Sequence, residues 1–506
     1  MLITIQHGLM EAATYPGCKK SSVIFNNEII FTSATILETY FDKNSHLTTT
    51  ELNQIAKTLR SNEIVDSSRE EFQCLNKITF GIVFDRARIA NKTKYLIKNK
   101  AKLLYIFNSD GIFTCMSCII DRLLAFEETG KESLVPLDIL KLLLSSVAVF
   151  QIVSEDTKPI NALFLKSMTA YIQFLEPVNK LDETLTISTP FGLENFYKTV
   201  NFGKVSNVLG RQNCVFSLSN SLVEGCEGAA VFNNKLRLIG MVSFTTLRRG
   251  AQNVNLTLVS SFQYIFREFL RQIGGKDGIC KFWKYSSPIW ERSIVLINNE
   301  DEQGTGILTK IVGKRYILTC SHIVHERVTT QCRYVDGNIE CNVLWKNPKI
   351  DEPYDIALLD APASIPDSYF VRISSNPPRL GQLIYNAGFP FFTNLGNDTF
   401  APSIFEGRII KCSPGLIMSD ASLQAGQSGG PMFDENGGIV GVCVCNIKAN
   451  ENIYPNINIA VPLWEIKTIL ERYSKSEDIK VLDNLIAEPK IKSIWNMELP
   501  WLESKL

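Results

Sequence analysis

The segment Gly426–Gln427–Ser428–Gly429–Gly430–Pro431 places one serine between glycines near the C-terminal end of a chain of 506 residues. A serine hydroxyl is a weak nucleophile by itself, so it needs a neighbouring base and backbone N–H groups aimed at the developing oxyanion. Glycines allow the concave turn that presents such N–H groups. The segment therefore predicts a nucleophilic Ser428, with the N–H groups of Gly426 and Ser428 as its oxyanion hole.

The base has few candidates, because the chain contains four histidines. His322 follows an apolar run in the sequence Thr319–Cys320–Ser321–His322, where a strand delivers it to the start of a turn. We therefore predict that His322 is the base, with His325, one helical turn later, as the weaker candidate. A carboxylate must hold the imidazole in the right tautomer. Asp355, directly before the apolar run Ile356–Leu359, fits that role.

The order His322, Asp355, Ser428 resembles that of chymotrypsin-like proteases, whereas α/β-hydrolases run Ser, Asp, His and subtilisins Asp, His, Ser. Each residue also has a structural explanation by itself. Glycine-flanked serines occur in flexible turns, single histidines are often structural, and an aspartate before a strand is often a cap. Their order and their shared context favour a serine protease with a double β-barrel over a non-catalytic relative.

Composition indicates more than one hydrophobic core and a peptide partner. The chain is 45% hydrophobic, and its 52 Lys and Arg balance its 52 Asp and Glu. The chain therefore has no overall basic charge to favour nucleic acid or an anionic membrane. We expect no signal peptide and no membrane span. Thirteen cysteines without paired metal-ligand spacing indicate reduced thiols inside a cell. No metal site and no cofactor are predicted. In that location the N-glycosylation sequons at Asn91, Asn255 and Asn397 would not be used.

The chain also repeats itself. Gly225–Phe232 aligns with Gly426–Phe433 and places Glu227 where the serine should be. Phe31–Leu37 aligns with Leu318–Val324 and places Thr35 where the histidine should be, while Ile160 falls about where the aspartate should be. Shorter matches join Pro190–Phe191 to Pro390–Phe391 and Gly203–Val205 to Gly407–Ile409. The first half is thus predicted to be a catalytically dead copy, with convergent barrel patterning as the alternative.

The fold class that follows is mainly β, with two tandem chymotrypsin-like double β-barrel units. The predicted divisions are a degenerate unit at 1–273 with a partly helical insert at about 40–149, a linker at 274–285, an active unit at 286–475 and a tail at 476–506. Each copy is expected to end with an amphipathic packing helix, one carrying Phe262 to Leu270 and the other Ile466 to Tyr473.

The last three residues, Ser504, Lys505 and Leu506, match the C-terminal address that the peroxisomal import receptor binds. They predict that receptor as a partner and the peroxisomal matrix as the location. The alternatives are chance occurrence of the tripeptide and a tail that is docked through Trp501 and Leu502.

The tail address, the trypsin-like segments and the degenerate first copy together resemble the peroxisomal leader-peptide-processing protease family, whose active domain is related to the Deg/HtrA proteases. The most specific matches are Leu318–His322, Tyr354–Leu359, Gly426–Pro431 and Ser504–Leu506. The resemblance implies removal of N-terminal leader peptides from imported matrix enzymes such as thiolase, with cleavage close to a cysteine, and processing of other matrix proteins. It also implies self-cleavage, for which Cys115 and Cys118 are our candidates.

Substrate preference is predicted from the residues around the serine. Ser422 stands six residues before Ser428, where trypsin-like enzymes that select Lys or Arg carry an acid. Val444, Cys445 and Asn446 would form the opposite edge of the pocket, so a small neutral side chain is expected at P1, although Asp420 is near. Gln427 replaces the acid that receives a new N-terminus in trypsin, so the barrel is expected to fold in a competent state.

Two other functions remain open. The chain could be a non-catalytic peptide-binding module, or a general degradative protease of the peroxisome that cuts at many sites. The first half could hold substrate, form a homo-oligomer, or be removed by self-cleavage.

Overall fold

The computed structural model describes residues 4–12, 18–41, 47–87, 94–124, 135–153, 160, 162–172, 175, 177–245, 247–249, 252–254, 256–274, 288–298, 303–349, 353–391, 400–449, 452–486 and 489–495. The chain divides into two compact units. The first is Met1–Gly250 with Asn255–Ser286, and the second is Ala251–Val254 with Ser287–Leu506. Among the described residues, no helix is both long and apolar enough to cross a membrane.

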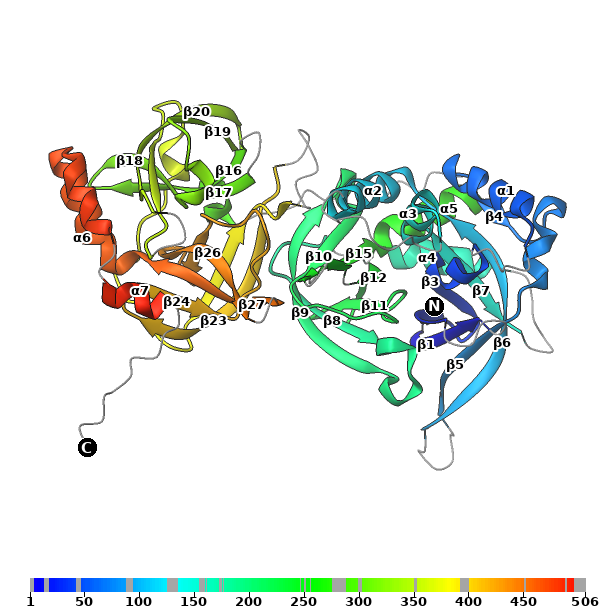
Figure 1. The fold of residues 1–506 in the computed structure, drawn as a ribbon. Helices are drawn as coiled ribbons and strands as arrows, with labels where there is room; N and C mark the ends of the chain where they lie inside the picture. The colour runs from blue at the N-terminus through cyan, green and yellow to red at the C-terminus, as the bar shows by residue number, and fades with distance from the viewer. Residues whose placement is uncertain are drawn as a thin grey trace. The chain divides into compact units, whose positions relative to one another are not determined.

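The second unit contains two closed rings of six antiparallel strands each (Figure 1). Around the first ring the strands are β16 (Ile294–Asn298), β17 (Gln303–Ile311), β18 (Lys314–Thr319), β21 (Ala357–Asp360), β20 (Gly337–Lys346) and β19 (Thr329–Tyr334). Around the second they are β22 (Leu383–Gly388), β23 (Ser403–Ser413), β24 (Leu416–Ser419), β27 (Asn452–Pro462), β26 (Ile439–Ala449) and β25 (Pro431–Asp434). Closure removes the exposed strand edges that would otherwise pair with other chains.

Runs of β-branched and aliphatic residues explain these strands, because such side chains suit a pleated surface that is buried on one or both faces. Ile294–Ile297 is buried along its whole length. The second ring encloses Ile384, Ile409, Ile417 and their neighbours. Short 3₁₀ turns at Ile289–Ser293 and Asp367–Tyr369 connect to these rings.

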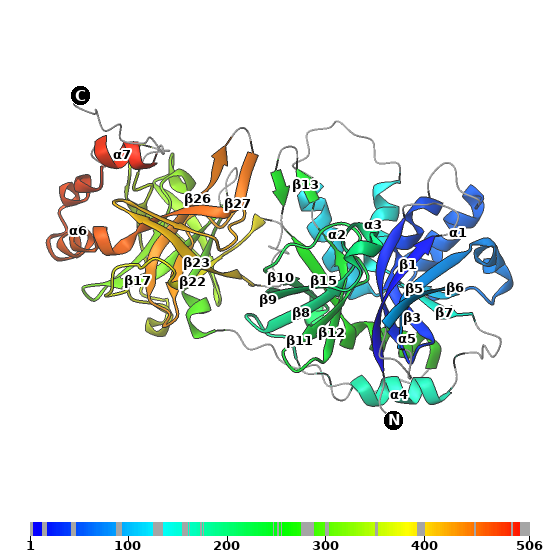
Figure 2. The ribbon, with the colours of Figure 1, turned by 90° about the horizontal axis from the view of Figure 1, so that it is seen from below.

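The unit ends in helices that cover one side (Figure 2). Helix α6 (Leu463–Ser476) follows Pro462 directly and buries Ile466, Leu470 and Tyr473. A 3₁₀ turn (Ile479–Leu485) and helix α7 (Pro489–Trp495) follow, and the indole Nε1 of Trp495 donates to the Gly415 carbonyl at 2.8 Å. Trp495, well into the segment predicted as a tail, is therefore bonded to the unit. Ser504–Leu506 lies outside the described residues.

The first unit has the same strand connectivity. The strands of its first ring are, in order, β1 (Ile5–Ala12), β2 (Lys19–Phe25), β3 (Ile29–Ser33), β7 (Val147–Ile152), β6 (Lys94–Phe107) and β5 (Phe80–Ala87). They correspond in that order to β16, β17, β18, β21, β20 and β19. The strands of its second ring are, in order, β8 (Glu183–Ser188), β9 (Thr199–Leu209), β10 (Val215–Leu218), β15 (Thr257–Ser261), β12 (Leu238–Phe244) and β11 (Ala230–Asn233). They correspond in that order to β22, β23, β24, β27, β26 and β25. Identical connectivity in four rings supports duplication over convergent patterning.

The predicted insert at 40–149 is wrong as one block, because β5, β6 and the first residues of β7 belong to the barrel. The additional elements lie in two separate places. Helix α1 (Thr49–Arg60), strand β4 (Val65–Asp66) and the 3₁₀ turn Glu70–Lys77 precede β5, whereas helices α2 (Asp110–Leu124) and α3 (Leu137–Ser145) lie between β6 and β7. The difference in length between the two units therefore comes from two insertions, one on each side of the barrel strands β5 and β6.

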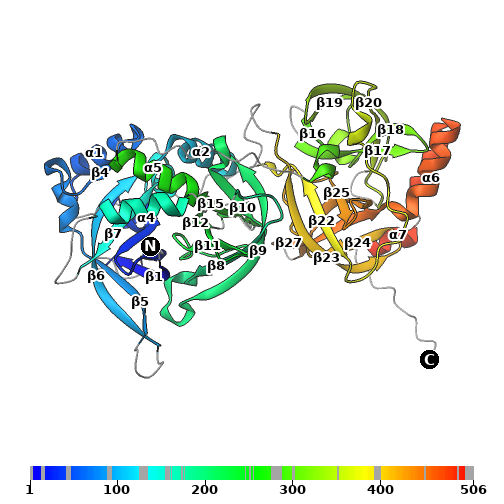
Figure 3. The same ribbon diagram turned by 180° about the vertical axis from the view of Figure 1, so that it is seen from behind.

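Helix α4 (Ala162–Ile172) leads into the second ring, and helix α5 (Phe262–Gly274) ends it; the two lie side by side (Figure 3). As predicted, α5 is amphipathic and buries Phe262, Phe266 and Phe269 completely. The short strands β13 (Leu247–Arg249) and β14 (Gln252–Val254) precede it.

Each unit has a glycine at the position where the loop of the second ring packs against the first ring. Gly429 has φ 83°, and a Cβ there would lie 2.2 Å from the Thr305 carbonyl oxygen and 2.3 Å from Thr319 Oγ1. Gly228 has φ 85°, and a Cβ there would lie 2.0 Å from the Ser21 carbonyl oxygen and 2.3 Å from Thr32 Oγ1. Only glycine allows this approach, so the glycine-rich loop of the second ring lies against the first ring in each unit.

Strand register corrects one alignment in the first unit. Thr319 pairs with Ala357 in the second unit, and Thr32 pairs with Ala148 in the first. The counterpart of Asp355 is therefore Ser146, which likewise stands two residues before its alanine. Ile160 is not the counterpart, because it lies beyond β7, outside any strand.

Glu227, the counterpart of Ser428, is buried in an ion pair. Its carboxylate accepts from Lys20 Nζ at 3.0 Å, from Thr245 Oγ1 at 2.5 Å and from the Gly225 N–H at 2.9 Å. Burial by itself would raise the pKa of the Glu227 carboxyl, but the Lys20 charge and the hydrogen bonds lower that pKa below its usual value. Since Gly225 corresponds to Gly426, the carboxylate occupies one of the two N–H groups that would bind an oxyanion.

Substitution of Gly429 by alanine tests the loop packing. Gly313 has a similar φ of 81°, but a Cβ there would meet nothing within 4 Å. Gly313→Ala should therefore cost only backbone strain, about 1 kcal/mol, whereas Gly429→Ala adds a backbone clash and should cost at least about 3 kcal/mol. Urea unfolding followed by tryptophan fluorescence measures both, and equal losses would contradict the packing argument.

The buried ion pair predicts non-additive mutations. Lys20→Met or Glu227→Gln should each lower the free energy of unfolding by about 3–5 kcal/mol, because each leaves a buried partner unpaired, and the double variant should lose less than the sum. Since the pKa of Glu227 is lowered, its contribution is complete above the usual value of 4.5 and is lost as the pH falls below it. Urea unfolding of the four proteins at several pH values tests this; additive losses would contradict it.

Candidate active site

His322 and Asp355 are brought together by the pairing of β18 with β21. His322 begins the 3₁₀ turn His322–Val324 just after β18, and Asp355 stands just before β21. Because these strands are antiparallel neighbours, the end of one meets the start of the other. Asp355 Oδ2 lies 2.5 Å from His322 Nδ1, and Asp355 Oδ1 accepts from the His322 backbone N–H at 3.0 Å.

The two side chains differ in exposure. The Asp355 side chain is 3% exposed and that of His322 is 28% exposed. A buried carboxylate on Nδ1 fixes the tautomer that carries its proton there, which leaves Nε2 able to accept a proton. His325 does not take part in this pair; its carbonyl oxygen accepts from Lys346 Nζ.

Two residues that hold Asp355 in place were missed in the sequence. Asn347 is 1% exposed, and its Nδ2 donates to the carbonyl of Tyr354 at 3.0 Å, while its carbonyl accepts from Ser321 Oγ at 2.6 Å. Asn347 thus links the strand segments that carry His322 and Asp355. Tyr354 has φ 60°, a left-handed conformation that is costly for a bulky residue and often marks a functional site. No sequence pattern signals either role.

The loop of Ser428 lies against the histidine segment. Cys320 Sγ donates to the Cys443 carbonyl at 3.3 Å, and that carbonyl also accepts from the Gly429 N–H at 2.7 Å. The Ser428 carbonyl accepts from the Thr305 N–H at 2.9 Å. The serine loop and the end of β18 therefore share hydrogen-bond partners.

The predicted oxyanion-hole groups differ from those of the first unit. Gly426 has φ 94°, and its carbonyl accepts from Thr305 Oγ1 at 2.8 Å. Within the described part of the chain, neither the Gly426 N–H nor the Ser428 N–H donates to a protein acceptor. Gln427 is buried between them, where its Oε1 accepts from the Gln424 N–H at 2.8 Å. The Gln427 side chain therefore stabilises the turn by a hydrogen bond.

The predicted pocket residues have different surroundings. Ser422 and Val444 are buried, whereas Cys445 is exposed. Asn446 Nδ2 donates to the Leu423 carbonyl at 2.9 Å, which ties the two predicted pocket edges together. Asp420, which we considered as an acid near the pocket, is exposed and accepts from the Arg408 N–H at 2.5 Å.

The candidates for self-cleavage lie in helix α2. Cys115 is 3% exposed, and Cys118 is partly buried. A protease cleft takes an extended peptide, so cleavage at either residue would require α2 to unwind.

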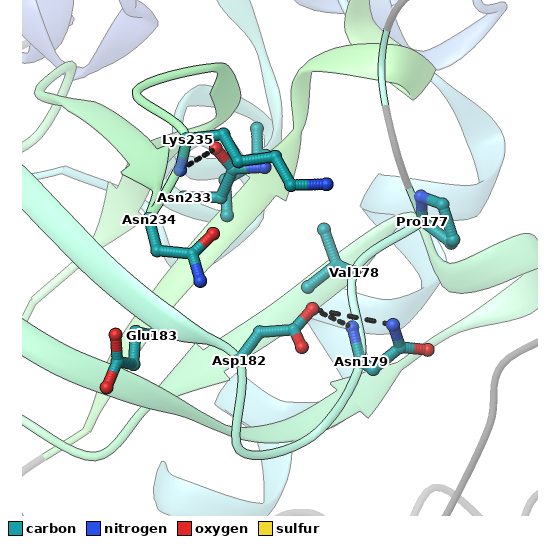
Figure 4. Close-up of a pocket in the computed structure, with 9 residues that line it drawn as sticks. Pro177, Val178, Asn179, Asp182, Glu183, Asn233, Asn234 and Lys235 are labelled. Atoms are coloured by element: carbon teal, nitrogen blue, oxygen red, sulfur yellow. Dashed lines mark hydrogen bonds between the residues drawn. The ribbon is translucent and has the colours of Figure 1, made fainter.

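A separate cavity of about 400 Å³ lies in the first unit (Figure 4). It is lined by Pro177, Val178, Asn179, Asp182, Glu183, Asn233, Asn234, Lys235 and Ile239. Asp182 accepts there from the Asn179 N–H at 2.8 Å. The lining contains none of the predicted site residues.

Residues 304–442 match the family model of the trypsin-like peptidase domain. The chain is 23% identical over 362 residues to the human peroxisomal leader peptide-processing protease, which covers 63% of this chain and 60% of that protein. It is 28% identical over 188 residues to the serine protease Do-like HtrA of Bacillus subtilis, covering 34% of this chain and 40% of that protein. Each match therefore spans less than two thirds of the relative's length.

Among solved structures, the serine endoprotease from Yersinia pestis matches with a TM-score of 0.31 and 20% identity, over 38% of this chain and 69% of that one. The second unit thus matches the trypsin-like peptidase domain over residues 304–442, and the chain is similar to the peroxisomal leader peptide-processing proteases and to HtrA-type serine proteases.

Proposed function

We propose that the chain is a serine endopeptidase in which His322, Asp355 and Ser428 form the catalytic triad. The observation that carries this proposal is the pair formed by the exposed edge of His322 and the buried Asp355, with 2.5 Å between Nδ1 and Oδ2. This pair belongs to a domain that matches the trypsin-like peptidases. The order of the three residues and the glycine loop around Ser428 add support.

In the proposed mechanism, His322 Nε2 removes the proton of Ser428 Oγ as this oxygen attacks the scissile carbonyl, and the same nitrogen returns the proton to the leaving amine. Asp355 stays ionised and stabilises the imidazolium that forms. The N–H groups of Gly426 and Ser428 bind the oxyanion of the tetrahedral intermediate. The first unit cannot repeat this chemistry, because Thr35, Ser146 and Glu227 stand at the three positions.

We further propose that the substrates are precursors of peroxisomal matrix enzymes, from which the peptidase removes N-terminal leader peptides. The similarity to leader peptide-processing proteases supports this substrate class. The C-terminal Ser504–Lys505–Leu506 supports import through the peroxisomal receptor. Gln427 stands directly before Ser428, where trypsin carries the acid that receives a new N-terminus. This is consistent with a domain that folds in an active state.

Ser428→Ala should abolish cleavage of a leader-bearing thiolase precursor, because it removes the nucleophile, while the unfolding curve stays unchanged. Asp355→Asn should lower kcat by about 10⁴, because the imidazole loses its correct tautomer. Intact mass spectrometry of the products measures both effects.

A fluorophosphonate probe provides the control, since it labels an activated serine and should not label Ser428→Ala. Absence of cleavage and of labelling in the unmodified protein would contradict the peptidase proposal and favour a peptide-binding module. Many cuts in place of one would favour a general degradative protease.

Small neutral residues should be preferred at P1, and Lys and Arg should be disfavoured, because the pocket carries Ser422 where selective trypsin-like enzymes place an acid. A library of peptides that differ only at P1 measures this preference as kcat/KM. A preference for Lys or Arg would contradict the assignment of Ser422 to the pocket and would indicate an acid such as Asp420 in its place.

A further inference from the structure

A thiol lies beside the proposed catalytic pair. Cys320 Sγ, one carboxylate oxygen of Asp355 and one ring nitrogen of His322 all lie within 4.8 Å of one another. Cys320 is 0% exposed, and its thiol donates to the Cys443 carbonyl at 3.3 Å. Peptide hydrolysis by a serine triad does not use a thiol at this position, so the cluster has chemistry that the proposed mechanism leaves unassigned.

These three donors are the types that Zn²⁺ prefers. Zinc binds thiolate sulfur at about 2.3 Å and imidazole nitrogen at about 2.0–2.1 Å, and three protein ligands with one open position form a familiar arrangement. Tetrahedral bonds of these lengths separate the donors by roughly 3.5 Å. The three donor atoms lie within 4.8 Å of one another, so side-chain movements of roughly 1 Å would bring them to these separations.

The cluster is specific to the second unit. The same fold in the first unit places Ser33, Thr35 and Ser146 at the positions of Cys320, His322 and Asp355. None of these three is a thiol, an imidazole or a carboxylate. The duplicated barrel therefore does not need the cluster in order to fold.

Resting on the triad of the proposed function, we propose that Cys320, His322 and Asp355 form an inhibitory binding site for Zn²⁺. The ion enters on the side of the His322 ring, which is 28% exposed. It binds Cys320 as the thiolate, Asp355 as the carboxylate and His322 through Nδ1, with water as the fourth ligand.

Binding of the ion removes the general base. The Cys320 proton leaves to solvent, because zinc binds the thiolate. The His322 proton moves from Nδ1 to Nε2 through solvent. An imidazole that carries its proton on Nε2 cannot accept the proton of Ser428, so peptide cleavage stops while the fold remains intact.

The first test is a zinc titration of peptidase activity. Zn²⁺ should inhibit the unmodified protein, EDTA should reverse the inhibition, and Mg²⁺ should have no effect because it prefers oxygen ligands. Cys320→Ala should raise the zinc concentration for half inhibition by about 10–100-fold or more, since even loss of an indirect partner costs that much. Cys412→Ala, which removes an exposed thiol on β23, is the matched control and should be inhibited by Zn²⁺ at the same concentration as the unmodified protein. Equal inhibition of Cys320→Ala would overturn the proposal.

The second test does not depend on activity. Co²⁺ added to the full-length Ser428→Ala protein should produce a sulfur-to-cobalt charge-transfer band in the near ultraviolet, and the double variant with Cys320→Ala should lack it. A band that persists without Cys320 would overturn the assignment. A Cys320-dependent band, together with no peptidase activity of the unmodified protein, would support the metal site and refute the proposed function. Full activity in zinc without a Cys320-dependent band would refute the metal site alone.

Discussion

The antiparallel pairing of β18 with β21 is the constraint on which the candidate site depends. It sets the end of one strand beside the start of the other, so that His322 and Asp355 meet although 32 residues separate them in sequence. Both carboxylate oxygens of Asp355 are then used on His322, one for the ring and one for the backbone. The register matters, because a shift by one residue would turn every side chain of a strand to the other face of the sheet.

A second constraint joins the two rings of the unit. Gly429 approaches the Thr305 carbonyl so closely that no side chain fits, and this contact sets the serine loop against the histidine segment. The first unit keeps the equivalent contact through Gly228, Ser21 and Thr32. The duplicated fold thus preserves the packing of the loop after the residues for catalysis have been replaced.

The comparison of the two units separates structure from chemistry. In the first unit Glu227 uses its carboxylate to neutralise Lys20 and to bind the Gly225 N–H. In the second unit the corresponding N–H groups have no protein acceptor among the described residues. A buried charge with its own partner stabilises a loop, whereas donors left open to a ligand favour binding of an incoming oxygen. The same backbone therefore serves as a closed structural turn in one copy and as a candidate oxyanion site in the other.

The sequence by itself determined the residue types, their order and the repeat. A glycine-flanked serine, a histidine after an apolar strand and an aspartate before another identify a chymotrypsin-like arrangement, because each depends on local neighbours that can be read in sequence. Only the tertiary structure decided what depends on strand register. It replaced Ile160 by Ser146 as the counterpart of Asp355, divided the insert into two parts, and revealed Asn347 and Tyr354 as supports of the aspartate. It also brought Asp355 beside Cys320 and His322, since proximity across paired strands follows from hydrogen-bond register and has no local signature in the chain.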